Sequence, residues 1–254
     1  MLLLAACGGG AAKVTGSASS ASSSSSTTTS ASTTSTTATT TTTSVPPATG
    51  PVTTAATVPA DTTPPGPEAS DVAFVTPEQL GASWHAGCPV GPDQLRLLSV
   101  TYWGFDGAAH QGQLVVNVTA VGALRSVFQQ LLAAQFPVRK VVTIDAYGGS
   151  DDLSAADDNT SAFNCREAVR SDGVHAWSVH AYGLAIDVND VENPYVDGDT
   201  IIPPNGADYV DRSNVRPGMA VPGNPLNAAF ASIGWGWGGG WSTPDYQHFS
   251  YNGK

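Results

Sequence analysis

The distribution of apolar and polar residues divides the chain into two parts. From residue 14 to about residue 70 it is almost wholly Ser, Thr, Ala, Val, Gly and Pro, and aromatic and β-branched residues first occur together near Val72. Residues 97–103 and 113–118 have the composition of strands and are separated by the turn-rich residues 104–107. We expect these two strands to form a hairpin.

An amphipathic helix should follow the hairpin and cover the sheet. Its apolar residues recur at intervals of three and four, at Leu124, Val127, Phe128, Leu131 and Leu132. Pro137 ends this pattern, because proline cannot continue a helix. Residues 140–146 then predict a further strand. The Gly- and Asp-rich stretch from there to residue 159 predicts a loop without regular structure, and its length suggests a function.

Two short strands are predicted in the last third of the chain. Residues 184–188 alternate in polarity, so Asp187 should point away from the apolar side of its strand. Residues 246–251 predict the last strand, with Tyr246, His248 and Ser250 on one face.

A short helix is predicted between those two strands. Asn224 supplies an N-cap and Pro225 a first-turn proline for a helix through residue 233, which Gly234 ends. Strands and helices are thus interspersed without regular alternation. This order indicates an α+β fold: a single small domain with a mainly antiparallel sheet flanked by helices.

Composition sets the domain boundaries that we expect. Residues 8–71 have too few apolar side chains to offset the entropy of ordering, so they predict a disordered tether. As a flexible coil this tether would reach roughly 40 Å. The folded domain should then occupy residues 72–254.

Residues 1–7 resemble the end of a bacterial lipoprotein signal, with residues 4–7 as the lipobox and Cys7 as the lipidated residue. The apolar run is shorter than the roughly 7 to 15 residues of a signal peptide, so we expect the true start codon to lie upstream. The alternative is a chance apolar terminus. No stretch approaches the ~18 apolar residues of a membrane span. We therefore expect an extracytoplasmic lipoprotein, anchored in the cell membrane through Cys7 and facing the cell wall.

The charge of the chain limits which partners are expected, and its cysteines indicate whether a disulfide forms. The net charge is −11, and only Lys13, Asp61 and Glu68 are charged before residue 71. Nucleic acid is therefore not an expected partner, and we expect a monomer. Cys88 and Cys165 are an even pair in a chain expected to be exported, which favours a disulfide. A zinc role for them is less favoured, because neither belongs to a CxxC pair.

The residues with the clearest chemical meaning lie in the last third of the chain. The segment SVHAYGLAID contains His180 and Asp187, and DYQH near the end contains His248. Two imidazoles and one carboxylate suit Zn²⁺ and leave a fourth position for water. Zinc can lower the pKa of such a water from ~15.7 to ~7 and polarise a carbonyl under attack. Asp245, which Pro244 places just before the last strand, can then act as general base.

The pattern SxHxxGxAxD followed by DxxH resembles the zinc D-alanyl-D-alanine carboxypeptidase family, which includes vancomycin-resistance carboxypeptidases and phage L-alanyl-D-glutamate peptidases. Segments GCPVGP, DAYG, NTSAFNCR and GWGWG resemble a bacterial branch of that family. The resemblance implies a Hedgehog/D,D-peptidase-like fold. It implies His180, Asp187 and His248 as zinc ligands, Asp245 as catalytic base, and peptidoglycan peptide as substrate.

The resemblance also implies a role for Arg166, which would bind substrate and stabilise the developing oxyanion. A surface ion pair is the alternative for Arg166. Ser178 would bind substrate or orient His180, or it is an ordinary strand-edge serine. Trp237 and Trp241 would line a substrate groove, although aromatic residues beside glycines often only pack.

Three functions therefore stay open at the level of sequence. The first is a D-alanyl-D-alanine carboxypeptidase. The second is an endopeptidase that cuts the L-alanyl-D-glutamate bond. The third is a metal-binding cell-wall module without turnover, which Asp245 argues against. His85, His110 and His175 are expected outside the metal site. The absence of GxSxG and HExxH excludes the commonest serine-hydrolase and thermolysin-like mechanisms.

Overall fold

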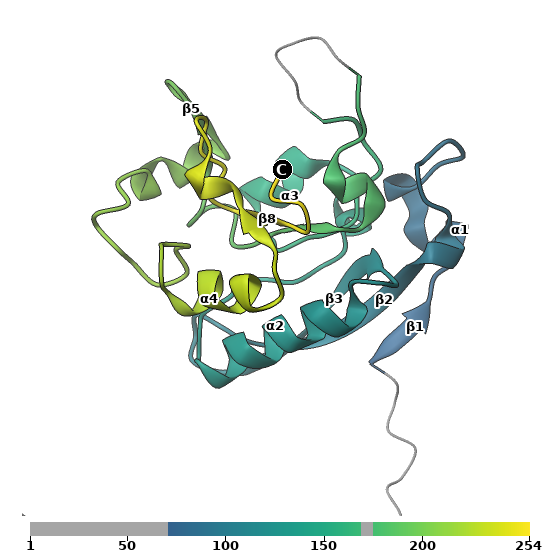
Figure 1. Ribbon diagram of the computed structural model, residues 1–254, viewed down its shortest axis with the longest axis horizontal. Helices are drawn as coiled ribbons and strands as arrows, with labels where there is room; N and C mark the ends of the chain where they lie inside the picture. Colours follow the sequence, from purple (N-terminus) through teal and green to yellow (C-terminus); the bar gives the residue numbers. More distant parts are fainter. Residues whose placement is uncertain (1–70, 169–174) are drawn as a thin grey trace, which may run out of the picture. The chain divides into compact units, whose positions relative to one another are not determined.

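The computed structural model describes residues 71–168 and 175–254 (Figure 1). The predicted lipid anchor at Cys7 and the predicted tether up to residue 70 lie outside these residues. In chain order, the main helices and strands are β1 (Val72–Phe74), α1 (Pro77–Leu80), β2 (Leu95–Trp103), β3 (Ala109–Asn117), α2 (Val121–Ala133), α3 (Asp151–Ala156), β4 (Ala185–Asp187), β5 (Tyr195–Asp197), β6 (Thr200–Ile202), α4 (Pro225–Ser232), β7 (Gly236–Trp237) and β8 (His248–Ser250).

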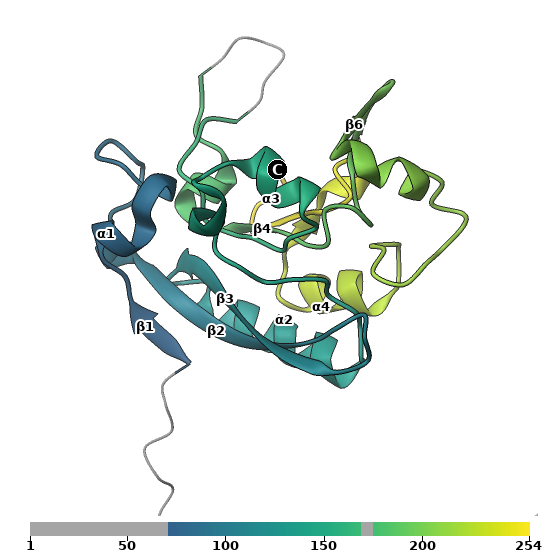
Figure 2. The same cartoon turned by 180° about the vertical axis from the view of Figure 1, so that it is seen from behind.

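The first sheet has the strand order β1-β2-β3, with both neighbouring pairs antiparallel. Strands β2 and β3 form the predicted hairpin, and α2 packs on this sheet as its apolar spacing predicts (Figure 1, Figure 2). Leu124, Val127 and Phe128 of α2 are buried in one core with Leu98 and Val100 of β2. The early part of the domain therefore supplies one wall of the hydrophobic core.

The second sheet has the order β4-β8-β7, again antiparallel. Ile186 of β4 pairs with Phe249 of β8, and both belong to the same core as α2. Phe230 of α4 stacks on Phe249 with ring centroids 4.1 Å apart. Because side chains alternate across a strand, the next pair in the register must face the opposite side. Because Ile186 and Phe249 point into the core, their neighbours Asp187 and His248 point to the opposite face of this sheet.

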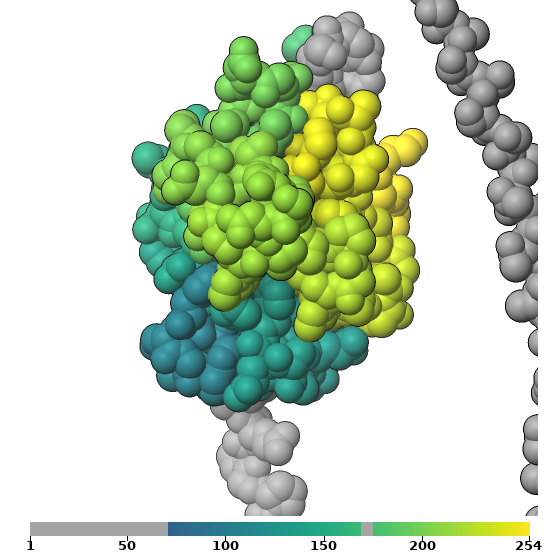
Figure 3. All heavy atoms as spheres, turned by 90° about the vertical axis from the view of Figure 1, so that its left-hand side faces the viewer, coloured from purple at the N-terminus to yellow at the C-terminus, as the bar shows by residue number. Residues whose placement is uncertain are grey.

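The remaining strands, β5 and β6, form a separate two-stranded antiparallel sheet. In the space-filling view of Figure 3, the residues around 190–220 and the C-terminal residues lie beside each other above the first sheet and α2. The predicted α+β class is confirmed, with antiparallel pairing distributed over three small sheets. Over the described residues, no helix is long and apolar enough to cross a membrane.

Two predictions for residues 140–159 are wrong. No strand forms at residues 140–146: Val141 makes an isolated bridge to Thr160 and its carbonyl accepts one hydrogen bond from the Gln113 amide, and a 3₁₀ turn, η3 (Ile144–Tyr147), follows. A strand needs a neighbour along its length, and here the contacts with the neighbouring segments are confined to residues 140–142. The stretch expected to be irregular contains helix α3. The Ser150 side chain accepts a hydrogen bond from the Leu153 amide and caps α3, which offsets its poor helix composition.

The predicted disulfide between Cys88 and Cys165 is confirmed, with the two Cα atoms 5.8 Å apart. Cys165 is buried in a second, smaller cluster with Leu95 and Phe163, and Cys88 packs against that cluster. The bond closes a loop with a sequence separation of 77. It therefore ties the start of the domain to the segment that leads into the site.

Candidate metal centre

Asp187 and His248 lie directly opposite each other in the second sheet, as Cα partners of β4 and β8. They are the register pair next to Ile186 and Phe249, whose side chains fill the core. The pleat therefore turns Asp187 and His248 together to the other face. The orientation of Asp187 is the one predicted from the alternation of residues 184–188.

His180 reaches the same point from a 3₁₀ turn, η4 (Val179–Tyr182). Ser178 is the N-cap of this turn, and its side chain accepts a hydrogen bond from the His180 amide at 3.3 Å. Gly183 ends the turn with a φ of 67°, and a Cβ there would lie 2.6 Å from the amide nitrogen of Asn117. The turn thus packs so closely on β3 that glycine is required, which fixes the distance between His180 and β4.

The three predicted ligands converge on one point. His180 Nε2 lies 3.2 Å from Asp187 Oδ2 and 3.2 Å from His248 Nδ1, and His248 Nδ1 lies 3.1 Å from Asp187 Oδ1. Ligands about 2.0–2.1 Å from a tetrahedral ion are separated by about 3.3 Å from one another. The spacing of the three donors therefore matches one small divalent cation.

The protonation states also fit a cation. His180 Nδ1 lies 2.5 Å from the carbonyl oxygen of Ala162, and His248 Nε2 lies 3.2 Å from that of Lys254. A carbonyl only accepts, so these outer nitrogens carry the protons and donate. In the neutral rings that bind a metal, the inner nitrogens then direct their lone pairs to the same point, which is the arrangement of two imidazole ligands on one cation.

The electrostatics of the centre point the same way. Burial alone would raise the pKa of Asp187, but His180 and His248 outweigh it and hold the pKa of this carboxyl well below its usual range. Burial lowers and Asp187 raises the pKa of His248, with a net shift upward. Asp187 is therefore a carboxylate over the whole physiological range, as a metal ligand must be.

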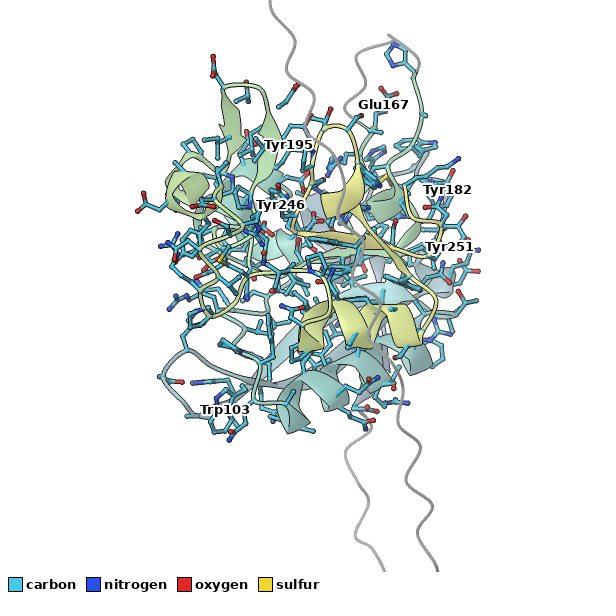
Figure 4. The ribbon with its side chains drawn as sticks, turned by 60° about the vertical axis from the view of Figure 1, so that its left-hand side comes forward. Trp103, Glu167, Tyr182, Tyr195, Tyr246 and Tyr251 are labelled. Atoms are coloured by element: carbon cyan, nitrogen blue, oxygen red, sulfur yellow. A yellow bond between two sulfur atoms is a disulfide. The ribbon has the colours of Figure 1, made fainter. Side chains whose placement is uncertain are left out.

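Asp245 lies in the loop just before β8. Its backbone is held on both sides: its amide donates to the carbonyl of Gly238, and its carbonyl accepts from the His248 amide. A bridge to Tyr195 pins the same loop against β5, and Figure 4 shows Tyr195 and Tyr246 close together in this region. Oδ1 of Asp245 is shielded from solvent and has no hydrogen-bond partner. Burial and the charge of Asp187 raise the pKa of Asp245 to about 7.

Arg166 lies near this group, since its charge acts on Asp245. Asp151, the first residue of α3, forms an ion pair with Nε of Arg166 and accepts a hydrogen bond from Nδ2 of Asn164 at 2.8 Å. The guanidinium is half-exposed, so the ion pair holds one edge of it. Its remaining N–H groups make only a long bond of 3.4 Å to the Glu167 carbonyl among the described residues.

The tryptophans differ in their surroundings. The Trp237 indole N–H donates to the carbonyl of Tyr246 at 2.8 Å, and its ring packs against Phe249. These contacts hold Trp237 within the domain, so its substrate-binding role stays a prediction. Trp241 lies closer to the centre, with its ring 5.3 Å from that of His248 and its N–H donating to the carbonyl of Gly253.

Sequence reasoning missed several groups around the centre. Asp151 and Asn164, which support Arg166, fall in segments that the sequence analysis singled out only as a whole, a long loop and the segment NTSAFNCR, without naming either residue. The main-chain oxygens of Ala162 and Lys254, which accept from the two histidines, cannot be predicted from the types of the side chains. Asp190 is buried with Oδ1 unpaired, and burial together with Asp187 and Asp158 raises its pKa well above the usual range. Its place three residues after Asp187 was the one available indication.

The histidines expected outside the site are indeed elsewhere. His110 pairs with Asp106, His175 pairs with Glu167, and His85 lies beside the disulfide.

A family model described as D-alanyl-D-alanine carboxypeptidase matches residues 172–251. This segment contains His180, Asp187, Asp245 and His248, whereas Arg166 precedes it. Comparisons with curated proteins and with solved structures gave no match. Over residues 172–251 the match agrees with the family whose motif the sequence resembles, and it supports a metallopeptidase that acts on peptidoglycan.

Proposed function

Since the segment that carries every predicted metal ligand matches the D-alanyl-D-alanine carboxypeptidase family, we propose that this chain is a zinc peptidase that removes the terminal D-alanine from peptidoglycan stem peptides. The observation that carries the proposal is the convergence of His180, Asp187 and His248 within 4.8 Å of one another. Three protein ligands are the number typical of catalytic zinc sites, which keep one position open.

His180, Asp187 and His248 would hold the cation. When bound, it supplies a Lewis acid that polarises the scissile carbonyl and lowers the pKa of water. The residues themselves supply rigidity: each imidazole is oriented by a main-chain carbonyl, and Asp187 is fixed by the strand pairing. Such outer hydrogen bonds set the ring orientation and increase ligand basicity.

Asp245 moves the proton. Its unpaired, shielded Oδ1 accepts a proton from the attacking water and can pass it to the leaving amine. The raised pKa of Asp245 suits both steps near neutral pH, because a base that is too weak would not take the proton and one that is too strong would not release it. A binding module has no need of such a group, which supports turnover over a non-catalytic role.

Arg166 binds the negative charge of the substrate. The ion pair with Asp151 fixes Nε, so the other guanidinium nitrogens are presented as a fork that matches a carboxylate. The substrate of a carboxypeptidase has a free carboxylate next to the bond that is cut, whereas the substrate of an endopeptidase does not. Arg166 is therefore the residue that favours removal of a terminal D-alanine, while the DxxH pair is shared with the endopeptidase branch of the resemblance.

Digestion of purified stem-peptide muropeptides, followed by mass spectrometry, tests the proposal. We expect loss of one alanine residue, abolished by a chelator and restored by Zn²⁺. Release of a peptide beginning with D-glutamate would show the endopeptidase instead. Unchanged muropeptides with the zinc-loaded chain would favour the non-catalytic wall module. Asp197→Asn, at an exposed strand position away from the metal ligands, is the matched control and should retain full activity.

We also propose that the enzyme works outside the cell, anchored through lipid at Cys7 by the Ser/Thr-rich tether. The lipobox-like residues 4–7 and a disulfide in the domain support this location. Metabolic labelling with a palmitate analogue should label the wild-type protein in the membrane fraction and leave Cys7→Ser unlabelled. Equal labelling of both would remove Cys7 as the anchor.

A further inference from the structure

A second group of metal-binding side chains lies away from the candidate centre, at the disulfide. Donor atoms of His85, Cys88 and Cys165 all lie within 4.8 Å of one another. His85 and Cys88 are three positions apart, and the spacing HxxC places two donors on one turn in the way that CxxC does. The absence of a CxxC pair therefore does not exclude a metal site at these cysteines.

The distance between His85 and Cys165 matches the spacing of two ligands on one metal ion. Nε2 of His85 lies 3.6 Å from Sγ of Cys165. Around a tetrahedral ion with a metal–sulfur distance of about 2.3 Å and a metal–nitrogen distance of about 2.0–2.1 Å, these two donors would be about 3.6 Å apart. His85 Nδ1 lies 3.1 Å from the carbonyl of Ala86 and donates to it. Nε2 is therefore the unprotonated nitrogen, and its lone pair faces the sulfur atoms.

We propose that reduction of the Cys88–Cys165 bond creates a second metal site, in which His85 and the two thiolates bind a soft divalent cation such as Zn²⁺ or Cd²⁺. The reductant is a dithiol. Its two sulfurs become a disulfide, while Cys88 and Cys165 receive its two electrons and two protons. The cation then displaces both thiol protons to the solvent, so charge and atoms balance.

The backbone around the cysteines holds the donors in place without the covalent bond. The amide of Cys165 donates to the carbonyl of Ser83 at 2.9 Å, and the amide of Cys88 donates to that of His85 at 3.1 Å. Cys165 is also buried in the cluster that contains Leu80 and Val90. Reduction thus leaves both cysteines on backbone segments that these hydrogen bonds and the buried cluster keep next to each other.

This site is distinct from the candidate centre in chemistry as well as in place. Sulfur ligands prefer soft cations and give an intense ultraviolet charge-transfer band with cadmium, which imidazole and carboxylate ligands do not give. A metal cross-link between His85, Cys88 and Cys165 would take over the connection that the disulfide makes. The segment leading to Arg166 would then stay attached to the start of the domain under reducing conditions.

Cadmium titration of the full chain tests the proposal. The protein is reduced with a dithiol, freed of it without oxygen, and titrated while ultraviolet absorption and circular dichroism are recorded. We expect one more equivalent of Cd²⁺ in the reduced than in the oxidised chain, together with the thiolate band. In His85→Ala the affinity for this additional Cd²⁺ should be at least tenfold lower. His110→Ala, which changes a histidine paired with Asp106 elsewhere, should leave it unchanged.

Three results would overturn the proposal. They are the absence of an additional equivalent after reduction, an unaltered affinity in His85→Ala, and a loss of the folded circular dichroism on reduction that cadmium does not restore. The variant His180→Ala lacks the candidate centre but keeps His85, Cys88 and Cys165. The thiolate band of this variant therefore reports cadmium bound at the second site alone. The outcome is therefore independent of whether the chain hydrolyses stem peptides.

Discussion

His180 and His248 each donate one ring N–H to a main-chain carbonyl, and this pair of hydrogen bonds makes two ordinary imidazoles into metal ligands. The identities of these histidines were predictable from the motif. Their orientation was not, because the carbonyls of Ala162 and Lys254 belong to residues of any type. A sequence pattern can therefore name the donor atoms while the fold decides which ring nitrogen faces inward.

Removal of one ligand should abolish the centre. In His180→Ala two donors remain, too few to hold zinc against the solvent, so we expect loss of the bound metal and at least a 100-fold loss of hydrolysis. Metal analysis of the purified full chain and the muropeptide assay measure the two effects. His110→Ala should keep both properties. Full metal content in His180→Ala would assign the ligand set to other residues.

Replacing the base should separate metal binding from turnover. Asp245→Asn retains the shape of the side chain but cannot accept a proton, so we expect unchanged zinc content with kcat lowered about 10² to 10⁴-fold. The same metal analysis and assay apply. Retained kcat in this variant would assign proton transfer to another group. Asp190, a buried carboxyl with an unpaired oxygen whose charge interacts with Asp245, would be the next to change.

The pH dependence of hydrolysis follows from the same carboxyl. Burial and Asp187 favour the protonated form of Asp245 and raise its pKa to about 7, while a bound cation would favour the carboxylate and lower it. Only the carboxylate accepts a proton, so kcat/KM should fall as the pH decreases through a value at or below about 7. A kcat/KM that stays constant down to the lowest pH at which the protein remains folded and metal-bound would contradict this role.

At the scale of elements, local patterns predicted the hairpin β2–β3 and the helices α2 and α4. In each of these elements, the spacing of apolar residues and the turn or cap residues that predict it lie within or next to the element itself. Residues 140–146 have equally strong β-branched character, but their neighbours in space offer one bridge and no ladder. Helix α3 was missed because its cap, Ser150, lies within a stretch whose glycines and aspartates also favour loops. Tertiary contacts decided the first case, and a local N-cap decided the second.

The turn η4 sets the distance between His180 and β4, so Gly183 should be intolerant of a side chain. Alanine there combines a φ of 67° with a Cβ 2.6 Å from the Asn117 amide nitrogen. We expect a loss of about 3 kcal/mol in the free energy of unfolding, from left-handed strain and overpacking together. Urea unfolding measures it, and zinc affinity should fall in parallel.

Gly198→Ala is the control for this substitution. Gly198 has a φ of 55° and no atom within 4 Å of the position of its Cβ, so only the conformational cost of about 1 kcal/mol applies. Equal effects of the two substitutions would show that the close approach of η4 to β3 does not matter.

At the scale of the whole molecule, an early part with β2, β3 and α2 and a later part with β4, α4 and β8 share one hydrophobic core, and the later part carries the metal ligands. The disulfide between Cys88 and Cys165 connects the two, and with a sequence separation of 77 it restricts the unfolded chain. Replacing both cysteines by serine should lower the free energy of unfolding by about 2–4.5 kcal/mol. Urea unfolding of the variant and of the oxidised protein checks this. No change in the midpoint would mean that the bond adds no stability.

The central claim is that two imidazoles and one carboxylate hold a single zinc ion. Zinc K-edge X-ray absorption on the full chain, kept oxidised and loaded with one equivalent, tests it most directly. We predict two histidine nitrogens and light oxygen ligands at about 2.0–2.2 Å, a signal that His180→Ala and His248→Ala both lose. A first coordination sphere with sulfur at about 2.3 Å, or a spectrum that neither substitution changes, would contradict the account.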